Sequence, residues 1–194
     1  MDQSRDVEQA RRLLRRMSQS LTHPEQVALY CSIILQSLSK EWLAIDEIKR
    51  NSLVHQLHMA ALLHDIGHAI ANHGHHKHTR YLIMHSDVLH GWDDTFRRDI
   101  AAIAFSHRKK AEKSWLTSHF FGDINLMKLA AILRIADGLD RSHRGHVQIH
   151  DSFYEGNSFI IQVSSLRPEF KQHVLTKKAD LWREAFPYSL VLKA

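Results

Sequence analysis

The stretch L-L-H-D-I-G at positions 62–67 places a histidine and an aspartate at the end of a helical pattern. Apolar residues recur before it at steps of three and four, which predicts a helix over residues 52 to about 66. His64 falls on the apolar stripe of that helix and is expected to point inward, with Asp65 beside it. Gly67 then permits the chain to turn away from the helix.

A second apolar stripe carries a carboxylate. The segment R-I-A-D-G-L-D at 134–140 continues a helical pattern that begins at Leu126, so Asp137 also faces the predicted core. A buried carboxylate or imidazole is costly unless it is paired or bound to a metal. We therefore expect Asp137, His64 and Asp65 to share one divalent cation. Mn, Fe, Ni and Zn suit such ligands, and Mg would suit them if carboxylate and water dominate.

Three more histidines accompany other predicted helices. Residues 22–25 have the pattern of a capping box with proline in the first turn, which puts His23 at the start of a helix. His78 opens a later helix, and His107 lies on the apolar stripe of the next one. The candidate metal ligands therefore come from five separate predicted helices, one of which carries the adjacent pair: His23, His64 with Asp65, His78, His107 and Asp137.

The composition fits a globular domain with its own core and excludes several other classes. Of the 194 residues, 44% are hydrophobic and 24% are charged, which argues against disorder and against a coiled-coil rod. No apolar run approaches the roughly 18 residues that cross a bilayer, and the N-terminus lacks the apolar core of a secretory signal. The single Cys31 fits a reducing cytoplasm, where we expect the protein. The net charge of +5 favours an anionic partner.

Chain breakers are scarce, and this scarcity predicts a helical body. The chain has 7 glycines and 3 prolines, and no proline occurs between Pro24 and Pro168. Most of that stretch is therefore expected to be helical. We assign the helical body to residues 1–145.

The end of the chain changes in character. Apolar and polar residues alternate on both sides of a turn at 155–157, which predicts a β-hairpin. A helix near 170–186 and a strand over 188–192 follow. We therefore predict a mainly α protein with a small α+β annex, residues 146–194, packed on the helical body.

The two quoted stretches, with a histidine about one helix before the first, resemble the metal-dependent HD phosphohydrolase superfamily. The resemblance covers nearly the whole helical body and implies an HD-domain helical bundle. The ligand order of that superfamily implies four ligands here: His23, His64, Asp65 and Asp137. Its two-metal members add two histidines in between, for which His78 in H-H-K-H-T and His107 in F-S-H-R-K fit.

A closer resemblance covers almost the entire chain. The segments N-H-G-H-H-K-H-T-R-Y-L-I at 72–83, S-H-R-K-K at 106–110 and K-K-A-D-L-W-R-E-A-F at 177–186 resemble the C-terminal half of the exopolyphosphatase and guanosine pentaphosphate phosphohydrolase family. In that family the phosphatase site belongs to N-terminal actin-like ATPase domains, which this sequence does not contain. Exopolyphosphatase activity is therefore not expected. Many C-terminal domains of the family resemble degenerate HD domains, whereas the full ligand set here favours an active metal site.

The resemblance implies metal-assisted hydrolysis of a phosphate ester or anhydride, with a nucleotide as the expected substrate. Asp65 would bridge two ions. His68 occupies the place where related HD proteins often carry the lysine of H-D-I-G-K, so it is a candidate to contact phosphate or to protonate the leaving group. Nearby basic residues are candidates to hold substrate phosphates: Arg108, Lys109, Lys110 and Arg141.

An alternative from another functional class stays open, namely a noncatalytic binding module. In that case the metal would only hold helices together, and the basic surface would bind polyphosphate, a nucleotide or a partner protein. Retention of His78 and His107 favours catalysis, because a structural ion needs no second set of ligands. The histidines over 73–76 are expected in a solvated loop or a transient metal-chelating patch. Membrane and nucleic-acid partners are not expected, whereas a homo-oligomer stays open.

Overall fold

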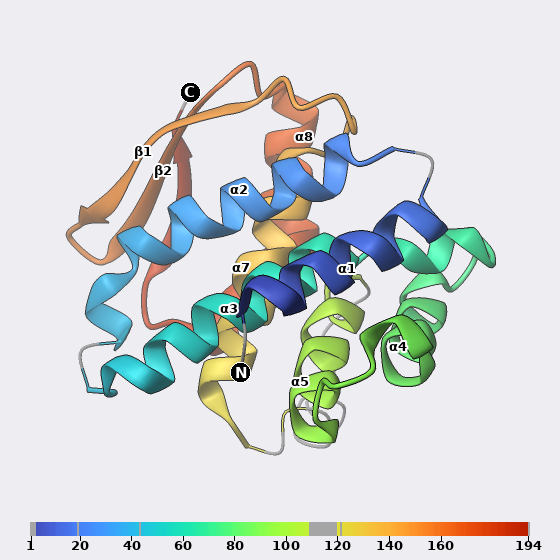
Figure 1. The fold of residues 1–194 in the computed structure, drawn as a ribbon. Coiled ribbons are helices and arrows are strands. Elements are labelled where there is room, and N and C mark those ends of the chain that lie inside the picture. The colour runs from blue at the N-terminus through green and yellow to red at the C-terminus, as the bar shows by residue number, and fades with distance from the viewer. Residues whose placement is uncertain (1–2, 19, 43, 109–119, 121, 194) are drawn as a thin grey trace.

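The computed structural model describes residues 3–18, 20–42, 44–108, 120 and 122–193. Figure 1 shows long helices that cross one another, with a small sheet to one side. The elements follow in this order: α1 Gln3–Met17, α2 Thr22–Ser37, η1 Ser39–Trp42, α3 Glu47–Leu63, η2 Ile66–Ala69, α4 His75–His85, η3 Asp87–Leu89, α5 Asp94–Phe105, α7 Ile124–Leu139, β1 Gln148–Glu155, β2 Ser158–Ser164, α8 Pro168–His173, η4 Val174–Lys178, α9 Asp180–Ala185 and β3 Ser189–Lys193.

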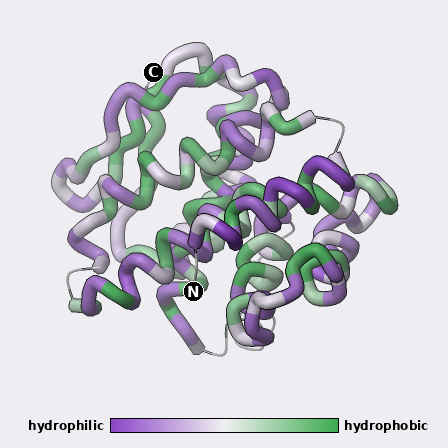
Figure 2. The backbone as a smooth tube through the Cα atoms, in the orientation of Figure 1, coloured by the Kyte–Doolittle hydropathy of each residue, from purple (hydrophilic) through white to green (hydrophobic). Residues whose placement is uncertain are grey.

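Helix α7 is the most enclosed element of the helical body. Every residue from Leu129 to Leu139 is buried, and α2, α3, α5 and α9 all pack against this helix. In Figure 2 the outer helix α1 is largely hydrophilic, whereas apolar residues follow the helices behind it. Because α7 is covered on several sides, its polar side chains Arg134 and Asp137 need partners inside the protein.

The annex forms a three-stranded sheet with the order β1-β2-β3. Strands β1 and β2 are antiparallel and meet at the predicted turn, where Gly156 has a φ of 57° that favours glycine. Strand β3 returns parallel to β2. Phe159 and Trp182 belong to the same hydrophobic core as the helical body. The predicted mainly α fold with a C-terminal α+β annex is therefore confirmed.

The helix expected over 170–186 is divided into three pieces. Helix α8 runs into η4, a five-residue π-helix, and α9 starts after it. The π-helical turn packs against α7 at Gly138, where a Cβ would lie 2.9 Å from Val174 Cγ2 and 3.1 Å from Lys178 Cγ. A side chain at Gly138 would therefore push this turn away.

The start of the helix that carries His23 differs from the prediction. Helix α1 ends at Met17, before the N-cap Leu21 of α2. The predicted capping box is wrong, because α2 already begins at Thr22 and its N-cap Leu21 has a helical backbone without a side-chain cap. The Thr22 N–H instead donates to Ser20 Oγ at 3.3 Å. Among the described helices, none has the length and apolar character needed to cross a membrane.

Candidate metal centre

Histidine and aspartate side chains that are far apart in the sequence meet in one cluster. It contains all the predicted metal ligands except His78, and His75 joins them. The members are His23, His64, Asp65, His75, His107 and Asp137.

The turn that follows α3 carries His64 and Asp65. Thr79 Oγ1 on α4 accepts a hydrogen bond from the Gly67 N–H at 3.0 Å and donates to the His64 carbonyl at 2.9 Å. A Cβ on Gly67 would lie 2.0 Å from the carbonyl oxygen of His75, so only glycine lets α4 pack this closely. The glycine after the His-Asp pair thus brings His75 to the cluster.

His23 lies in the first turn of α2 and is held by a carboxylate at the end of α7. Its Nδ1 donates to Asp140 Oδ2 at 2.8 Å, and the fully buried Asp140 also accepts from the Gly145 N–H at 2.8 Å. A carboxylate behind a metal-binding histidine fixes the orientation and tautomer of its ring. Asp140 is absent from the predicted site residues, although its spacing of three from Asp137 is a signal that points to it.

Asp137 is shared between the cluster and the annex. Its Oδ1 lies 3.6 Å from His23 Nε2 and 3.8 Å from His64 Nε2. Its Oδ2 accepts a hydrogen bond from Lys178 Nζ, which also donates to the His107 carbonyl at 2.9 Å. Lys178 lies in the motif at 177–186, but helical periodicity alone could not show that it reaches Asp137.

The first group of donor atoms comprises two imidazole nitrogens and two carboxylate oxygens. The Nε2 atoms of His23 and His64 are 3.3 Å apart, and each lies 3.6 Å from Asp65 Oδ2. Asp137 Oδ1 completes the group. Ligands about 2.1 Å from an ion at tetrahedral angles lie about 3.4 Å from one another. The distances from the two Nε2 atoms to each other and to the two carboxylates, 3.3 to 3.8 Å, are therefore close to the spacing around one divalent ion.

The second group lies on the other side of Asp65. Its Oδ1 is 3.3 Å from the Nε2 atoms of His75 and His107, which are 2.9 Å apart, and His107 Nδ1 donates to the Ala104 carbonyl. Because Asp65 Oδ2 belongs to the first group, this carboxylate spans both. Three protein donors leave coordination positions for water or substrate, as in catalytic sites. His78 is half-buried on α4, and no contact among the described residues joins it to either group.

Hydrogen bonds behind the rings determine which nitrogen carries the proton. His23 Nδ1 faces the Asp140 carboxylate, and His64 Nδ1 faces the Ala61 carbonyl at 2.8 Å. Both partners only accept hydrogen bonds, so Nδ1 is the donor in each ring. In the neutral rings both Nε2 atoms then present lone pairs to each other. Such an arrangement repels unless a proton or a metal ion lies between the nitrogens.

The cluster shifts the pKa values of its members in opposite directions. Burial lowers the pKa of His23, but hydrogen bonds with Asp137 and Asp140 outweigh it and raise this pKa to about 9. Burial lowers the pKa of His64 to about 4, so that ring is neutral at pH 7. Burial raises the pKa of Asp65, but its histidine neighbours outweigh that effect and hold this pKa well below its usual range. Without a metal ion, His23 therefore holds a proton.

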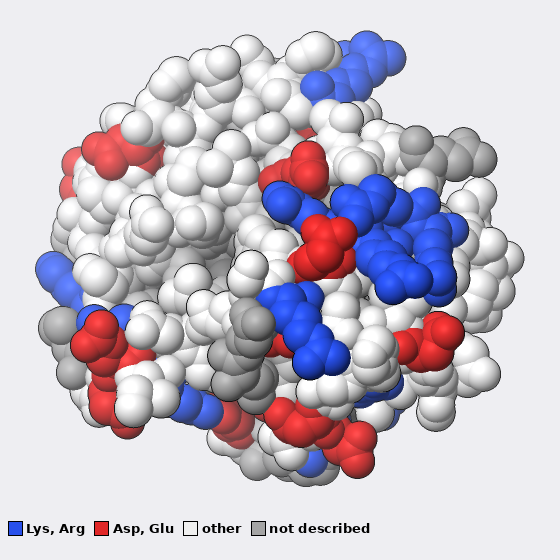
Figure 3. Space-filling view, in the orientation of Figure 1, with Lys and Arg blue, Asp and Glu red and all other residues white. Residues whose placement is uncertain are grey.

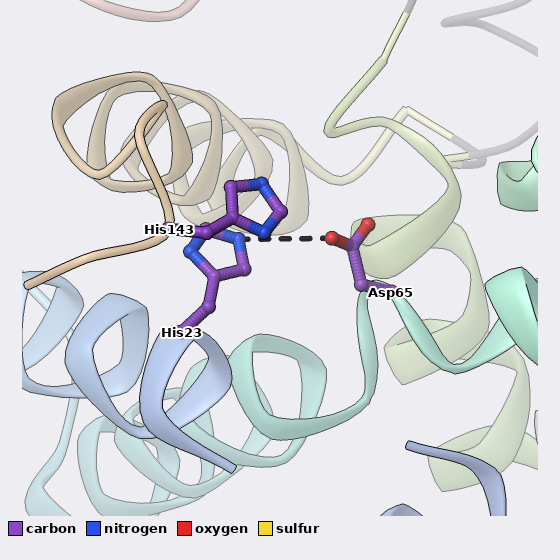
Figure 4. Close-up of side chains that lie close together, drawn as sticks. All are labelled: His23, Asp65 and His143. Carbon is purple, nitrogen blue, oxygen red and sulfur yellow. Dashed lines mark ion pairs between the residues drawn. The ribbon is translucent and has the colours of Figure 1, made fainter. Parts of the chain in front are cut away.

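A cleft of about 520 Å³ opens onto the cluster, and His143 borders it on one side. His143 has a left-handed backbone with a φ of 55°, and its ring stacks on that of His23 at 3.7 Å. Figure 4 shows the His23 and His143 rings together, opposite the Asp65 carboxylate. His143 lies in the turn after α7, where helical periodicity gives no signal for it.

His68 borders the same cleft from the turn after α3. Its side chain is 38% exposed, with Nε2 at 3.7 Å from Asp65 Oδ1. Its Nδ1 lies 2.9 Å from Asn72 Oδ1, and its ring stacks on that of His75. His68 is therefore held beside the donor atoms and can still reach a ligand in the cleft.

The predicted phosphate contacts are described only in part. Arg108 Nη1 lies 2.8 Å from His75 Nδ1, which places the guanidinium beside the second group. Lys109 and Lys110 lie outside the described residues. Arg141 is exposed on the turn that follows α7.

Basic side chains also gather away from the cluster. Figure 3 shows lysine and arginine grouped where the C-terminal half of α1 lies in Figure 1, with acidic residues close by. Arg15 pairs with Glu8 at 2.6 Å, and Arg16 pairs with Asp87 at 3.9 Å. Part of this charge is therefore offset locally, as for a solvated face.

Comparison with known families supports the relationship that the motifs indicate. The family model for the Ppx/GppA phosphatase, domain III, matches residues 7–185. The match includes the whole cluster and most of the annex. No curated protein matches the chain significantly.

Proposed function

Because the chain belongs to the Ppx/GppA phosphatase domain III family, we propose that it is a metal-dependent phosphohydrolase with an HD-type site for two divalent ions. The substrate is a phosphate ester or anhydride, with a nucleotide as the leading candidate. The first ion is assigned to His23, His64, Asp65 and Asp137, and the second to His75, His107 and Asp65.

One observation carries this proposal, namely the approach of two imidazole nitrogens that both lack protons in their neutral rings. His23 Nε2 and His64 Nε2 lie 3.3 Å apart in the protein interior. The carboxylates of Asp65 and Asp137 lie against the same two atoms. Four electron-rich atoms in one buried place require a proton on His23 or a metal ion, and the distances of 3.3 to 3.8 Å suit a metal ion.

The chain's own residues prepare such a site for two ions. When bound, divalent ions would polarise a phosphoryl oxygen and lower the pKa of a water molecule. Asp65 offers one oxygen to each group, so both groups face the same substrate. Lys178 binds Asp137 Oδ2 and leaves Oδ1 for the cluster. Asp140 holds the His23 ring with Nε2 directed inward.

His68 is assigned the role of general acid. The Asn72 side chain holds its Nδ1, and its Nε2 lies on the side of the Asp65 carboxylate at the cleft. A proton on Nε2 would pass to the leaving-group oxygen of a substrate bound against Asp65. Arg108, beside His75, is assigned to the substrate phosphate.

Metal analysis and a phosphate-release screen test this function together. The purified protein is analysed for bound metal and then assayed with Mn, Fe, Ni, Zn or Mg on nucleotides, cyclic nucleotides and polyphosphate. We expect bound divalent metal and release of phosphate from at least one ester or anhydride. Asp65→Asn, which keeps the shape of the side chain, should lose metal and activity together. An exposed control, Asp151→Asn on β1, should keep both.

The two halves of the proposal fail separately. Metal binding without release of phosphate from any substrate would favour a noncatalytic module that binds polyphosphate, a nucleotide or a partner protein. Absence of divalent metal from the folded protein would contradict the metal centre itself.

A further inference from the structure

A second cleft lies between the end of α7 and the annex. Its volume is about 320 Å³, and it is lined by Asp137, Gly138, Arg141, His143, Phe170 and Lys178. His143 also lines the larger cleft at His68, so the two clefts meet at this residue. Asp137 lines the smaller cleft and also belongs to the first group of donor atoms, so this cleft is adjacent to that group.

Lys178 brings a positive charge to the boundary between the cleft and the cluster. Its side chain is 13% exposed, and its ammonium group donates to Asp137 Oδ2 and to the His107 carbonyl. An ammonium group has three N–H donors. Within the part of the chain that the structure describes, the third donor has no acceptor, which leaves it for a ligand in the cleft.

Arg134 fixes the backbone that carries Lys178. This arginine is 2% exposed and donates to the carbonyls of Lys177 and Lys178, at 3.1 and 3.2 Å, and to the Ser106 carbonyl at 2.7 Å. One buried guanidinium thus joins the π-helical turn to the end of α5. The position of Lys178 is therefore set before a ligand arrives.

Arg141 supplies a second positive charge to the lining of the cleft. Its guanidinium lies 3.0 Å from His173 Nε2, which leaves most of its N–H donors available. Burial lowers the pKa of His173, and the charges of Arg141 and Lys178 lower it further. Two positively charged side chains, Lys178 and Arg141, therefore line the cleft together with the Asp137 carboxylate.

We propose that this cleft is a second phosphate subsite, in which Lys178 and Arg141 bind a phosphoryl group linked to the one at the metal centre. The inference rests on the proposed function and specifies its substrate class as compounds with two linked phosphoryl groups. Asp137 directs Oδ1 to the cluster and Oδ2 to Lys178, so one carboxylate separates the two positions. A substrate with a single phosphoryl group would leave one of them empty.

Binding of two matched, non-hydrolysable probes tests the subsite. Methylenediphosphonate and methylphosphonate are titrated calorimetrically into the Mn²⁺-loaded protein without free metal. We expect the diphosphonate to bind at least about tenfold more tightly, because charge-assisted hydrogen bonds to Lys178 and Arg141 add to its affinity. Adenosine α,β-methylene diphosphate forms a third arm, and tighter binding of this probe would identify nucleotides rather than inorganic diphosphate as the source of the two groups.

Single variants assign the effect to the cleft. Arg141→Ala should weaken diphosphonate binding about tenfold or more and leave methylphosphonate binding within about twofold. Lys178→Met also removes the partner of Asp137 Oδ2, so its effect is read as the ratio of diphosphonate to methylphosphonate affinity, which should fall about tenfold or more. Lys177→Met is the matched control, since its side chain is exposed one residue earlier and should change neither affinity. If Lys178→Met does not fold, the exposed Arg141→Ala decides the question alone.

The outcomes separate this inference from the proposed function. Equal affinity for the two phosphonates, or diphosphonate binding that neither variant weakens, would overturn the subsite even if metal binds and phosphate is released. Failure of the wild-type protein to bind Mn²⁺ would reject the proposed function, and the subsite would fall with it.

Discussion

The Nε2 atoms of His23 and His64 lie 3.3 Å apart, although 41 positions separate the two residues in the sequence. Each ring donates from Nδ1 to a group that only accepts, namely the Asp140 carboxylate for His23 and the Ala61 carbonyl for His64. When both rings are neutral, the fold therefore directs two lone pairs into one buried place, which a proton on His23 or a metal ion must occupy. This relationship links the packing of α2 on α3 to the chemistry of the site.

The α4 helix provides a direct test of which histidine completes the second group. His75→Ala should lose one of two bound metal equivalents and most hydrolysis, because His75 Nε2 lies 3.3 Å from Asp65 Oδ1. His78→Ala, in the same helix, should keep both equivalents and the activity of the parent. Elemental analysis of the two folded variants measures this difference. The reverse pattern would assign the second group to His78.

Asp140→Asn should weaken metal binding without removing a ligand. The neutral amide would hold the His23 ring less firmly than the carboxylate does, and loss of a carboxylate behind a metal-binding histidine typically costs about 10–100-fold in affinity. Competition with a chelator of known metal affinity measures the affinity of the variant for the ion. Asp151→Asn serves as the exposed control. An unchanged affinity would show that Asp140 has only a structural role.

His68→Ala should separate metal binding from turnover. His68 lies at the cleft, 3.7 Å from Asp65 Oδ1, and is not assigned as a ligand. We expect full metal content and a rate lower by roughly 100-fold, the effect of losing a positioned proton donor. Steady-state phosphate release and metal analysis on the same preparation provide the comparison. An unchanged rate would remove His68 from the mechanism.

Metal binding should release a proton near neutral pH. The pKa of His23 is raised from 6.5 to about 9 in the metal-free protein, so its proton stabilises the folded state fully below pH 6.5, and this stabilisation is lost as the pH rises through about 9. A metal ion displaces this proton, so metal affinity should increase with pH up to about 9. Calorimetry in buffers of different ionisation enthalpy should detect about one proton released at pH 7.5. Binding without proton release would contradict the protonated His23.

Helical periodicity predicts the interior position of His64 and Asp137 because both lie on long, regular stripes. Both are buried in the structure. The same reasoning cannot select the α4 histidine, because His75 and His78 are three positions apart and therefore lie on neighbouring parts of one helical face. Gly74, with a φ of 70°, sets the start of α4 at His75. That backbone conformation is not evident from the histidine-rich sequence.

Contacts between distant elements account for the remaining differences. A π-helical turn contains more residues than an α-helical turn, so the regular helix predicted over 170–186 directs Lys178 to a different face. This turn packs closely on Gly138 and accepts hydrogen bonds from Arg134. Both contacts depend on how α7 and the annex pack together, which local sequence patterns do not predict. His143 reaches the site from a turn, where no periodicity applies.

The number of Mn²⁺ ions bound per chain tests the two-ion centre most directly. Metal-free protein is titrated with Mn²⁺ beside Asp65→Ala, which removes the carboxylate shared by both groups of donor atoms. We predict two ions per chain for the parent protein and loss of both high-affinity sites in the folded variant. A single ion in the parent protein, or two ions that survive the loss of Asp65, would contradict a centre bridged by this carboxylate.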